Sequence, residues 1–422
     1  GCIALALGWA SARAASRDGP LDALARAVPR CDLRGVVQER AGGLGDLVWV
    51  EVISCDGRPR LADAGVVALD GGGDIGFEVD AEGWLLPLGE GPFDASLRRA
   101  GAHAVFDPRS VQRAPPEGGL AGVAHSLRRA LRRATAPLEG DRAGLLRGLA
   151  IGDTSSLGPH AVETLRRAGL SHLVAVSGSN VAIVVGCLVW ALAPLGLRAR
   201  VAGALLGLAL FVVVVGPEPS VLRAAAMGAV GLAALASGRR SEPLHALALA
   251  LIAVIGARPH LALSVGLALS ASATGGIVLW ARPVARRLGW MPRPLALGLA
   301  ATLSAQAAVA PLLIAVFGAV SVTAPAANLL ALPAIAPATV LGLGAALAGA
   351  LFEPAGRALA RGAEPFVAWV LWVGDLLGAP AWASAEVSRG WALPLAAVVA
   401  ALVCGALATR RGRGGVAPGA PG

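Results

Sequence analysis

Long apolar runs recur along the chain from residue 170 onward, and they decide its class of structure. A membrane-spanning helix needs about 20 predominantly apolar residues. With 56% hydrophobic residues and a mean hydropathy of +0.68, the chain is too apolar for a soluble domain of its size. We therefore predict a polytopic α-helical membrane protein. Apolar segments are expected at 171–196, 200–216, 220–238, 243–257, 260–281, 295–317, 325–351, 365–379 and 391–408.

The charges between these segments predict their direction. Arginines follow every second crossing, whereas the intervening loops carry no net positive charge. The arginines are Arg198, Arg200, Arg239, Arg240, Arg282, Arg286, Arg287 and Arg293. Because loops rich in arginine stay in the cytoplasm, the first crossing is expected to run from outside to inside. The segment before residue 170 is then extracytoplasmic. The short segments 243–257 and 365–379 favour re-entrant or interfacial helices, so the side of the C-terminus stays open, although Arg410, Arg411 and Arg413 favour the inside.

Residues 29–112 have the pattern of a small extracytoplasmic β-barrel. Short β-type runs alternate with Gly- and Asp-rich turns, and a short helix is expected at Asp94 to Ala100. An oligonucleotide-binding (OB) fold is one candidate that periodicity alone does not select. The expected strands are Leu33 to Arg40, Leu47 to Ser54, Gly65 to Leu69, Ile75 to Val79, and Ala102 to Phe106.

Two cysteines of this segment, Cys31 and Cys55, can form a disulfide if the segment faces an oxidising compartment. The five cysteines of the chain show no metal-binding spacing, and we expect no metal and no cofactor. Residues 1–12 read as the remnant of a transmembrane helix, and residues 409–422 as a basic, disordered tail.

Residues 113–169 are basic and amphipathic. Leu127 and Leu131 lie four residues apart, which gives one apolar stripe with a cationic flank. This pattern is typical of a helix at the membrane surface, and a solvated charged face is the alternative. The interfacial basic residues are Arg128, Arg129, Arg132 and Arg133.

Four small or polar residues interrupt the first apolar run at Ser177-Gly178-Ser179-Asn180. Irregular backbone at membrane depth survives only inside protein or beside a water-filled cavity. Ser and Asn can cap a new helical segment, whose free N–H groups attract anions. The alternative is close helix packing through small residues.

A cation lies in the third apolar segment, where Ser220 and Arg223 follow Pro219. Such a charge either reaches back to the membrane surface or lines a polar path. Polar residues in later segments, Ser270, Gln306 and Asn328 among them, describe a polar interior.

Five ordered blocks resemble the ComEC/Rec2 competence proteins. The stretch HLVAVSGSNVAI is similar to the family signature HLLAISGLHVG, and GLLRGLAIGDTSSL, with Asp153, to an upstream family segment. PSVLRAAAM resembles its P-S-x-x-R-A-x-x-M segment, and LSAQAAVAPLLIAVFGAVSVTAPAANLLALP its block with Gln, F-G and N-L-x-x-x-P. GWLLPLGEGPFDASLRRAGAHAVF resembles the end of its OB-like domain. The resemblance covers roughly residues 30–385.

Two departures qualify the resemblance. The signature His is Asn180 here, so a capping or hydrogen-bonding role survives and an imidazole role does not. Many relatives carry a C-terminal metallo-β-lactamase-like nuclease domain. We find no HxHxDH cluster, and we expect no catalytic residue and no enzyme activity in this chain.

The resemblance implies an inner-membrane channel that passes single-stranded DNA into the cytoplasm of a bacterium, with residues 170–408 as the channel domain. Expected partners are single-stranded DNA, the lipid bilayer, a periplasmic DNA receptor and a cytoplasmic helicase-type motor, and homo-oligomerisation is open. The alternatives are a secondary transporter of a small anion and a membrane-embedded hydrolase using Ser177 with His245 or His260. The path candidates are Asp153, Ser177, Gly178, Ser179, Asn180, Ser220, Arg223, Ser270, Gln306 and Asn328.

Overall fold

The computed structural model describes most of the chain. The described residues are 20–40, 46–56, 61–70, 74–89, 91, 94, 97, 102–116, 118–174, 176–239 and 241–414. The expected remnant helix at 1–12 lies outside them, as does most of the helix expected at Asp94 to Ala100.

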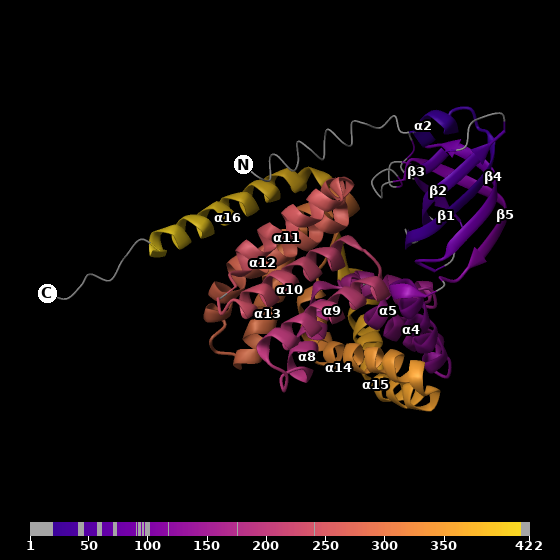
Figure 1. Cartoon of the computed structure of the whole chain (residues 1–422). Coiled ribbons are helices and arrows are strands. Elements are labelled where there is room, and N and C mark those ends of the chain that lie inside the picture. Colours follow the sequence, from indigo (N-terminus) through magenta and orange to yellow (C-terminus); the bar gives the residue numbers. More distant parts are fainter. Residues whose placement is uncertain are drawn as a thin grey trace.

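The N-terminal part is a closed five-stranded barrel (Figure 1). Its strand order is β1-β2-β3-β5-β4, so that β1 pairs with both β2 and β4. Only β3 and β5 run parallel among these pairs. This Greek-key arrangement confirms the predicted OB-like barrel. The strands are β1 (Arg30–Arg40), β2 (Asp46–Cys55), β3 (Leu61–Leu69), β4 (Glu78–Pro87) and β5 (Ala104–Ala114).

Two strand predictions were wrong in place and length. The strand expected at Ala102 to Phe106 begins at Ala104 and continues to Ala114. The strand expected at Ile75 to Val79 begins at Glu78 and continues to Pro87. Its burial alternates strictly from Glu78 to Leu85, as in a strand with one buried face. Residues 74–76 belong instead to the turn before β4. That turn contacts the helical part and is important below.

The barrel interior is filled by aliphatic side chains and Phe106, which is 1% exposed. Helix α2 (Pro20–Ala25) contributes Leu21 and Leu24 to the same core. Phe77 packs against His125 of α4 with ring centroids 5.1 Å apart. Trp84 is the aromatic residue of β4 that faces outward, at 40% exposed.

The rest of the described chain is helical, apart from a small antiparallel two-stranded sheet of β6 (Ala319–Ser321) and β7 (Ser384–Glu386). The helices are α4 (Gly119–Thr135), α5 (Gly140–Ile151), α6 (Pro159–Arg167), α7 (Ser171–Val174), α8 (Gly178–Ala191), α9 (Leu197–Val215), α10 (Pro219–Ala236), α11 (Pro243–Ala257), η2 (Pro259–Leu263), α12 (Val265–Arg287), α13 (Arg293–Phe317), α14 (Ala324–Leu351), α15 (Glu353–Gly378), η3 (Ala381–Ala383), η4 (Arg389–Trp391) and α16 (Ala392–Gly414).

Five of these helices, α9, α10, α12, α13 and α14, are long and apolar enough to cross a membrane. They confirm the predicted polytopic helical membrane protein. Helices α8 and α11 are apolar but shorter. The expected segment 365–379 is the second half of the longer α15. Helix α16 continues to Gly414, so the first residues of the tail expected to be disordered are helical.

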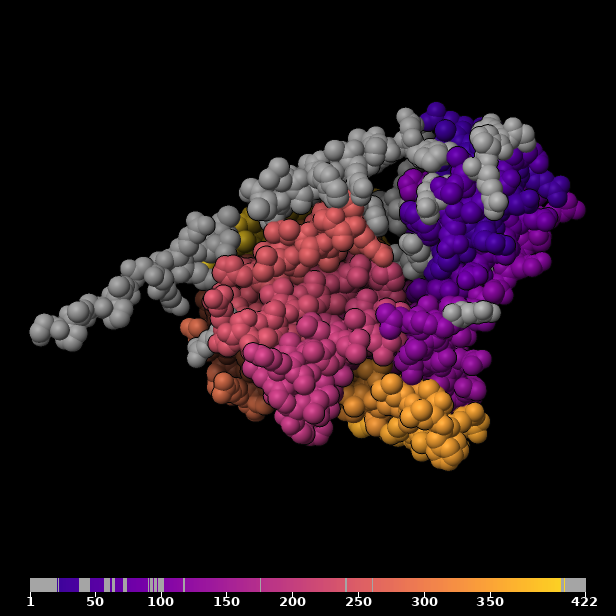
Figure 2. Space-filling view, viewed as in Figure 1, coloured from indigo at the N-terminus to yellow at the C-terminus, as the bar shows by residue number. Residues whose placement is uncertain are grey.

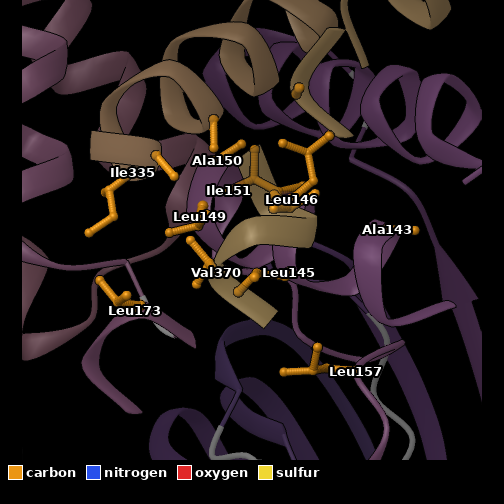
Figure 3. Packing of buried hydrophobic residues seen from close by; sticks show 14 of the residues in the cluster. Ala143, Leu145, Leu146, Leu149, Ala150, Ile151, Leu157, Leu173, Ile335 and Val370 are labelled. Carbon is orange, nitrogen blue, oxygen red and sulfur yellow. The ribbon is translucent and has the colours of Figure 1, made fainter. Parts of the chain in front are cut away.

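Helices α4 and α5 pack inside the helical part and do not lie alone at a surface. Their leucines share one large core with α6, α14 and α15, and Figure 3 shows Leu145, Leu146 and Leu149 meeting Ile335 and Val370. Leu131 is fully buried in this core. The amphipathic stripe of 113–169 therefore faces protein, because α14 and α15 cover it.

The barrel sits at one end of the helical part, next to α4 (Figure 2). Helices α8, α9 and α10 surround a second core that includes Val181, Leu208 and Val221. The candidate site lies between the barrel and this second core, where α5, α8 and α10 meet.

Candidate functional site

The predicted interruption of the first apolar run is a real break between two helices. Helix α7 ends at Val174 and α8 begins at Gly178, with Ser177 in an extended conformation at the N-cap. The Ser177 hydroxyl contacts Ser179 Oγ at 2.6 Å and Asn180 Oδ1 at 3.4 Å. It makes no side-chain cap bond to the helix. The first backbone N–H groups of α8 are thus left without a side-chain acceptor from the N-cap residue.

Two side chains hold this break inside protein. Asn180 is fully buried and donates from Nδ2 to the Leu149 carbonyl of α5 at 3.0 Å. Ser220, in the first turn of α10, donates to the Val176 carbonyl at 3.1 Å. Backbone carbonyls away from water need such partners. The residue at the position of the family His therefore has a positioning role in this chain.

Arg223 lies directly beside the break. It is 4% exposed, which counts against the first of its two alternatives, that it reaches back to the membrane surface. Its Nε donates to Ser270 Oγ of α12 at 2.9 Å, and Nη1 approaches Met227 Sδ at 3.1 Å. A Cβ on Gly178 would lie 3.0 Å from Nη2, so only a glycine leaves this approach open. Among the described residues, no carboxylate forms an ion pair with Arg223.

Asp153 belongs to a second cluster, at the junction of barrel and helices. Gly152 ends α5 in the left-handed conformation, with φ 75°, which suits glycine. The turn lets Asp153 accept from the Ser155 hydroxyl at 2.7 Å and from Arg132 Nε at 2.9 Å. Both Nη atoms of Arg132 also donate to the carboxylate of Asp74 in the barrel, at 2.6 and 2.7 Å. One guanidinium thus joins α4, the barrel and the end of α5.

Arg128 completes this junction. It is 5% exposed and donates to the carbonyls of Val214, Ile75 and Val213 at 2.7–2.8 Å. The cationic flank expected at the membrane surface is therefore wrong for Arg128 and Arg132, because both face the barrel junction. Arg129 and Arg133, on the other side of α4, are exposed.

The junction shifts the pKa values of its charged groups. Burial alone would raise the pKa of Asp153, but the hydrogen bond from Ser155 and the charge of Arg132 outweigh it and lower that pKa to about 2. The hydrogen bond to Asp74, opposed by burial, raises the pKa of Arg132 above its ordinary value. Both groups are therefore charged at neutral pH.

The remaining path candidates lie elsewhere. Gln306 donates to the carbonyl of Ser321, the last residue of β6, at 2.6 Å. Asn328 donates to the Ala324 carbonyl within α14 at 2.8 Å. The structure therefore brings together Ser177, Gly178, Asn180, Ser220, Arg223 and Ser270, and gives Gln306 and Asn328 separate local contacts.

A small cavity of about 40 Å³ opens at the barrel junction. Asp74, Arg128, Arg132, Asp153 and Glu218 contribute to its lining. This space suits a few water molecules and is too small for a nucleotide. Sequence reasoning missed Asp74 and Glu218. The Gly-rich turn around Asp74 and the Pro-Glu-Pro loop around Glu218 were visible in the sequence, but only the fold brings them together.

Cys31 and Cys55 are paired residues of β1 and β2, with Cα atoms 4.1 Å apart, and their sulfur atoms form a disulfide. Within the described residues, no group of three or more His, Cys, Asp or Glu side chains is placed to hold a metal ion.

Comparison with known proteins adds the family. A family model described as Competence protein matches residues 149–412, which is more than half of the chain. The chain belongs to the competence protein family. The matched region contains the break between α7 and α8, Asp153 and Arg223.

One relative of known name is ComE operon protein 3 of Bacillus subtilis (strain 168). It is 30% identical over 141 residues, which cover 33% of this chain and 18% of that protein. The matched part is thus less than a fifth of the relative's length. No solved structure matches the chain at a significant level.

Proposed function

We propose that this protein passes single-stranded DNA across the inner membrane of a bacterium during natural transformation. The observation that carries the proposal is the break between α7 and α8 with Arg223 buried beside it. A DNA strand brings one negative charge per nucleotide, so a path through lipid needs cations or helix N-termini. This site offers both, in a chain whose family implies DNA uptake.

The proposed orientation places the barrel outside the cell. Arg128 ties Ile75 of the barrel to the last turn of α9, through Val213 and Val214. Arg198 stands at the other end of α9. Because arginine-rich loops stay in the cytoplasm, the barrel end of α9 is extracytoplasmic in this proposal. The Cys31–Cys55 disulfide fits an oxidising compartment.

The barrel would receive the strand before it enters the helices. OB-like barrels bind single strands through a basic groove and aromatic stacking. Here the exposed Trp84 and the exposed arginines of β5, Arg109 and Arg113, are the groups available for such contacts. The core position of Phe106 gives that residue a structural role. The other partners of the proposal are a periplasmic DNA receptor and a cytoplasmic helicase-type motor.

The junction beside the site holds a cavity of about 40 Å³, which is too small for a strand. We propose a homo-oligomer as the arrangement to test by cross-linking in the membrane.

A second candidate, a transporter of a small anion, also fits an arginine at a helix N-terminus. The hydrolase candidate has less support. The Ser177 hydroxyl contacts Ser179 and Asn180, while His245 lies near Glu242.

The test is deletion of the gene in its host, followed by feeding of fluorescent duplex DNA. The proposal expects label held at the cell envelope in the deletion strain and label in the cytoplasm after the gene is restored. Normal internalisation by the deletion strain of a competent host would overturn it.

A further inference from the structure

The starting observation is the buried guanidinium of Arg223, which forms no ion pair with any residue that the structure describes. Its Nε and Nη1 contact a hydroxyl of Ser270 and the thioether of Met227. Burying a charge costs several kcal/mol unless an opposite charge or strong hydrogen bonds compensate. The acid nearest along the chain, Glu218, lines the barrel junction with Arg128 and Arg132. It forms no ion pair with Arg223 among the described residues.

Positive potential from two helix ends adds to this charge. Helix α8 has 14 residues, and the first bonds at its N-terminus run from the N–H groups of Asn180 and Val181 to the Ser177 carbonyl. The N–H groups of Gly178 and Ser179 precede these bonds. Helix α10, with 18 residues, starts beside the same break, since Ser220 bonds to Val176. Each N-terminus carries about half a positive charge.

The site is open on one side. Ser179 is exposed, Ser177 and Gly178 are half-buried, and Arg223 lies beneath them. An anion entering past Ser179 would meet the two serine hydroxyls, the start of α8 and then Nη2 of Arg223. A tetrahedral oxyanion can accept from all of these donors at once.

We propose that this cluster is a binding site for one phosphate group, which a phosphodiester of the passing strand occupies. The inference rests on the proposed function and adds the ligand chemistry of the site. In this proposal the strand moves by exchange of successive phosphates at the cluster. Ser270 positions the guanidinium through Nε and leaves Nη2 directed at Gly178.

The test varies the charge of the DNA backbone and the charge of the residue 223 side chain in the same uptake assay. Arg223→Gln should lower uptake of ordinary DNA about ten- to hundredfold, the loss expected for a charge-assisted hydrogen bond. Arg223→Lys should restore part of it, because the charge is kept and the two-donor geometry is lost. Arg198→Gln, an exposed arginine at the far end of α9, is the matched control and should leave uptake unchanged.

The second part of the experiment uses DNA whose entering strand carries neutral methylphosphonate linkages. The parent should take up this DNA poorly, and Arg223→Gln should reduce its uptake little further. An equal fold-loss for charged and neutral DNA would overturn the phosphate site, as would unchanged uptake of ordinary DNA by Arg223→Gln at normal protein level. If deletion of the whole gene leaves uptake intact, the proposed function itself fails, which separates the two failures.

A binding measurement keeps the inference testable should Arg223→Gln accumulate poorly. In detergent-solubilised parent protein, inorganic phosphate should compete with a labelled oligothymidylate. In Gly178→Val the added side chain would stand against Nη2, and this competition should be lost. Competition by phosphate that persists unchanged in Gly178→Val would contradict the site. Phosphate binding without oligothymidylate binding would assign the site to a free anion and contradict the phosphodiester.

Discussion

Replacing Asp153 by Asn should loosen the junction of barrel and helices. Asp153 is 4% exposed and receives Arg132 and Ser155. Its pKa falls from the ordinary 3.8 to about 2 in the folded chain, which corresponds to roughly 2 kcal/mol of stability at neutral pH. Removing one partner of a fully buried pair costs about 3–5 kcal/mol. Since the Arg132 side chain is 34% exposed, solvent screens the pair. We therefore expect Asp153→Asn to cost roughly 2 kcal/mol.

The measurement is equilibrium unfolding of the purified protein in detergent, for the parent, Asp153→Asn, Arg132→Gln and the double variant. The cycle should give a coupling energy of about 1–3 kcal/mol, as for residues in direct contact. Arg133→Gln, one residue further along α4 and exposed, is the control. Proteolysis between Ala114 and α4 should also accelerate in Asp153→Asn. If Asp153→Asn unfolds like the control, within about 0.5 kcal/mol, the junction does not join the two parts.

The pH dependence follows from the same carboxyl. Its folded pKa lies below its unfolded value, so its contribution is complete above pH 3.8 and is lost as the pH falls toward about 2. The parent should lose roughly 2 kcal/mol more than Asp153→Asn across this window.

Three further changes test other parts of the structure. Replacing Cys31 and Cys55 by Ser should destabilise the barrel by roughly 3 kcal/mol, because the bond closes a loop across 24 positions; alkylation should add mass only after reduction. Asn180→Ala removes a buried bond to α5 and should cost about 1–3 kcal/mol in unfolding, with wild-type stability counting against its positioning role. In Gly378→Ala the added Cβ would collide with the Thr164 carbonyl oxygen, so the variant should be destabilised by about 1–3 kcal/mol and melt at a lower temperature.

The apolar runs and turn signals were sufficient for the fold class. Helices in lipid must satisfy their own backbone, so hydropathy alone identifies them. Strand β4 was misplaced because it is rich in Glu, Asp, Gly and Ala, which are uncommon in strands. Its alternation of exposed residues with the buried Val79, Ala81 and Leu85 was nevertheless visible in the sequence.

The sequence was sufficient to predict several residues of the site, but not the partners that they contact. The break at Ser177 followed from four small or polar residues in an apolar run. The partners of Arg128 and Arg132 did not, because an arginine on an amphipathic helix looks the same whether it faces lipid or a buried carboxylate. Asp74 lies 58 positions from Arg132, and only the closure of the barrel brings them together.

The central claim is that DNA passes the break between α7 and α8, and cross-linking of DNA in transit tests this claim most directly. A photoreactive residue at Ser179 stands at the open side of the site, and one at Leu206, 68% exposed on α9, faces away as a control. In cells stalled during uptake, the account predicts protein–DNA adducts at Ser179 and not at Leu206, and weaker adducts at Ser179 when Arg223 is replaced by Gln. Adducts at neither position, in cells whose cytoplasm still receives DNA, would contradict it.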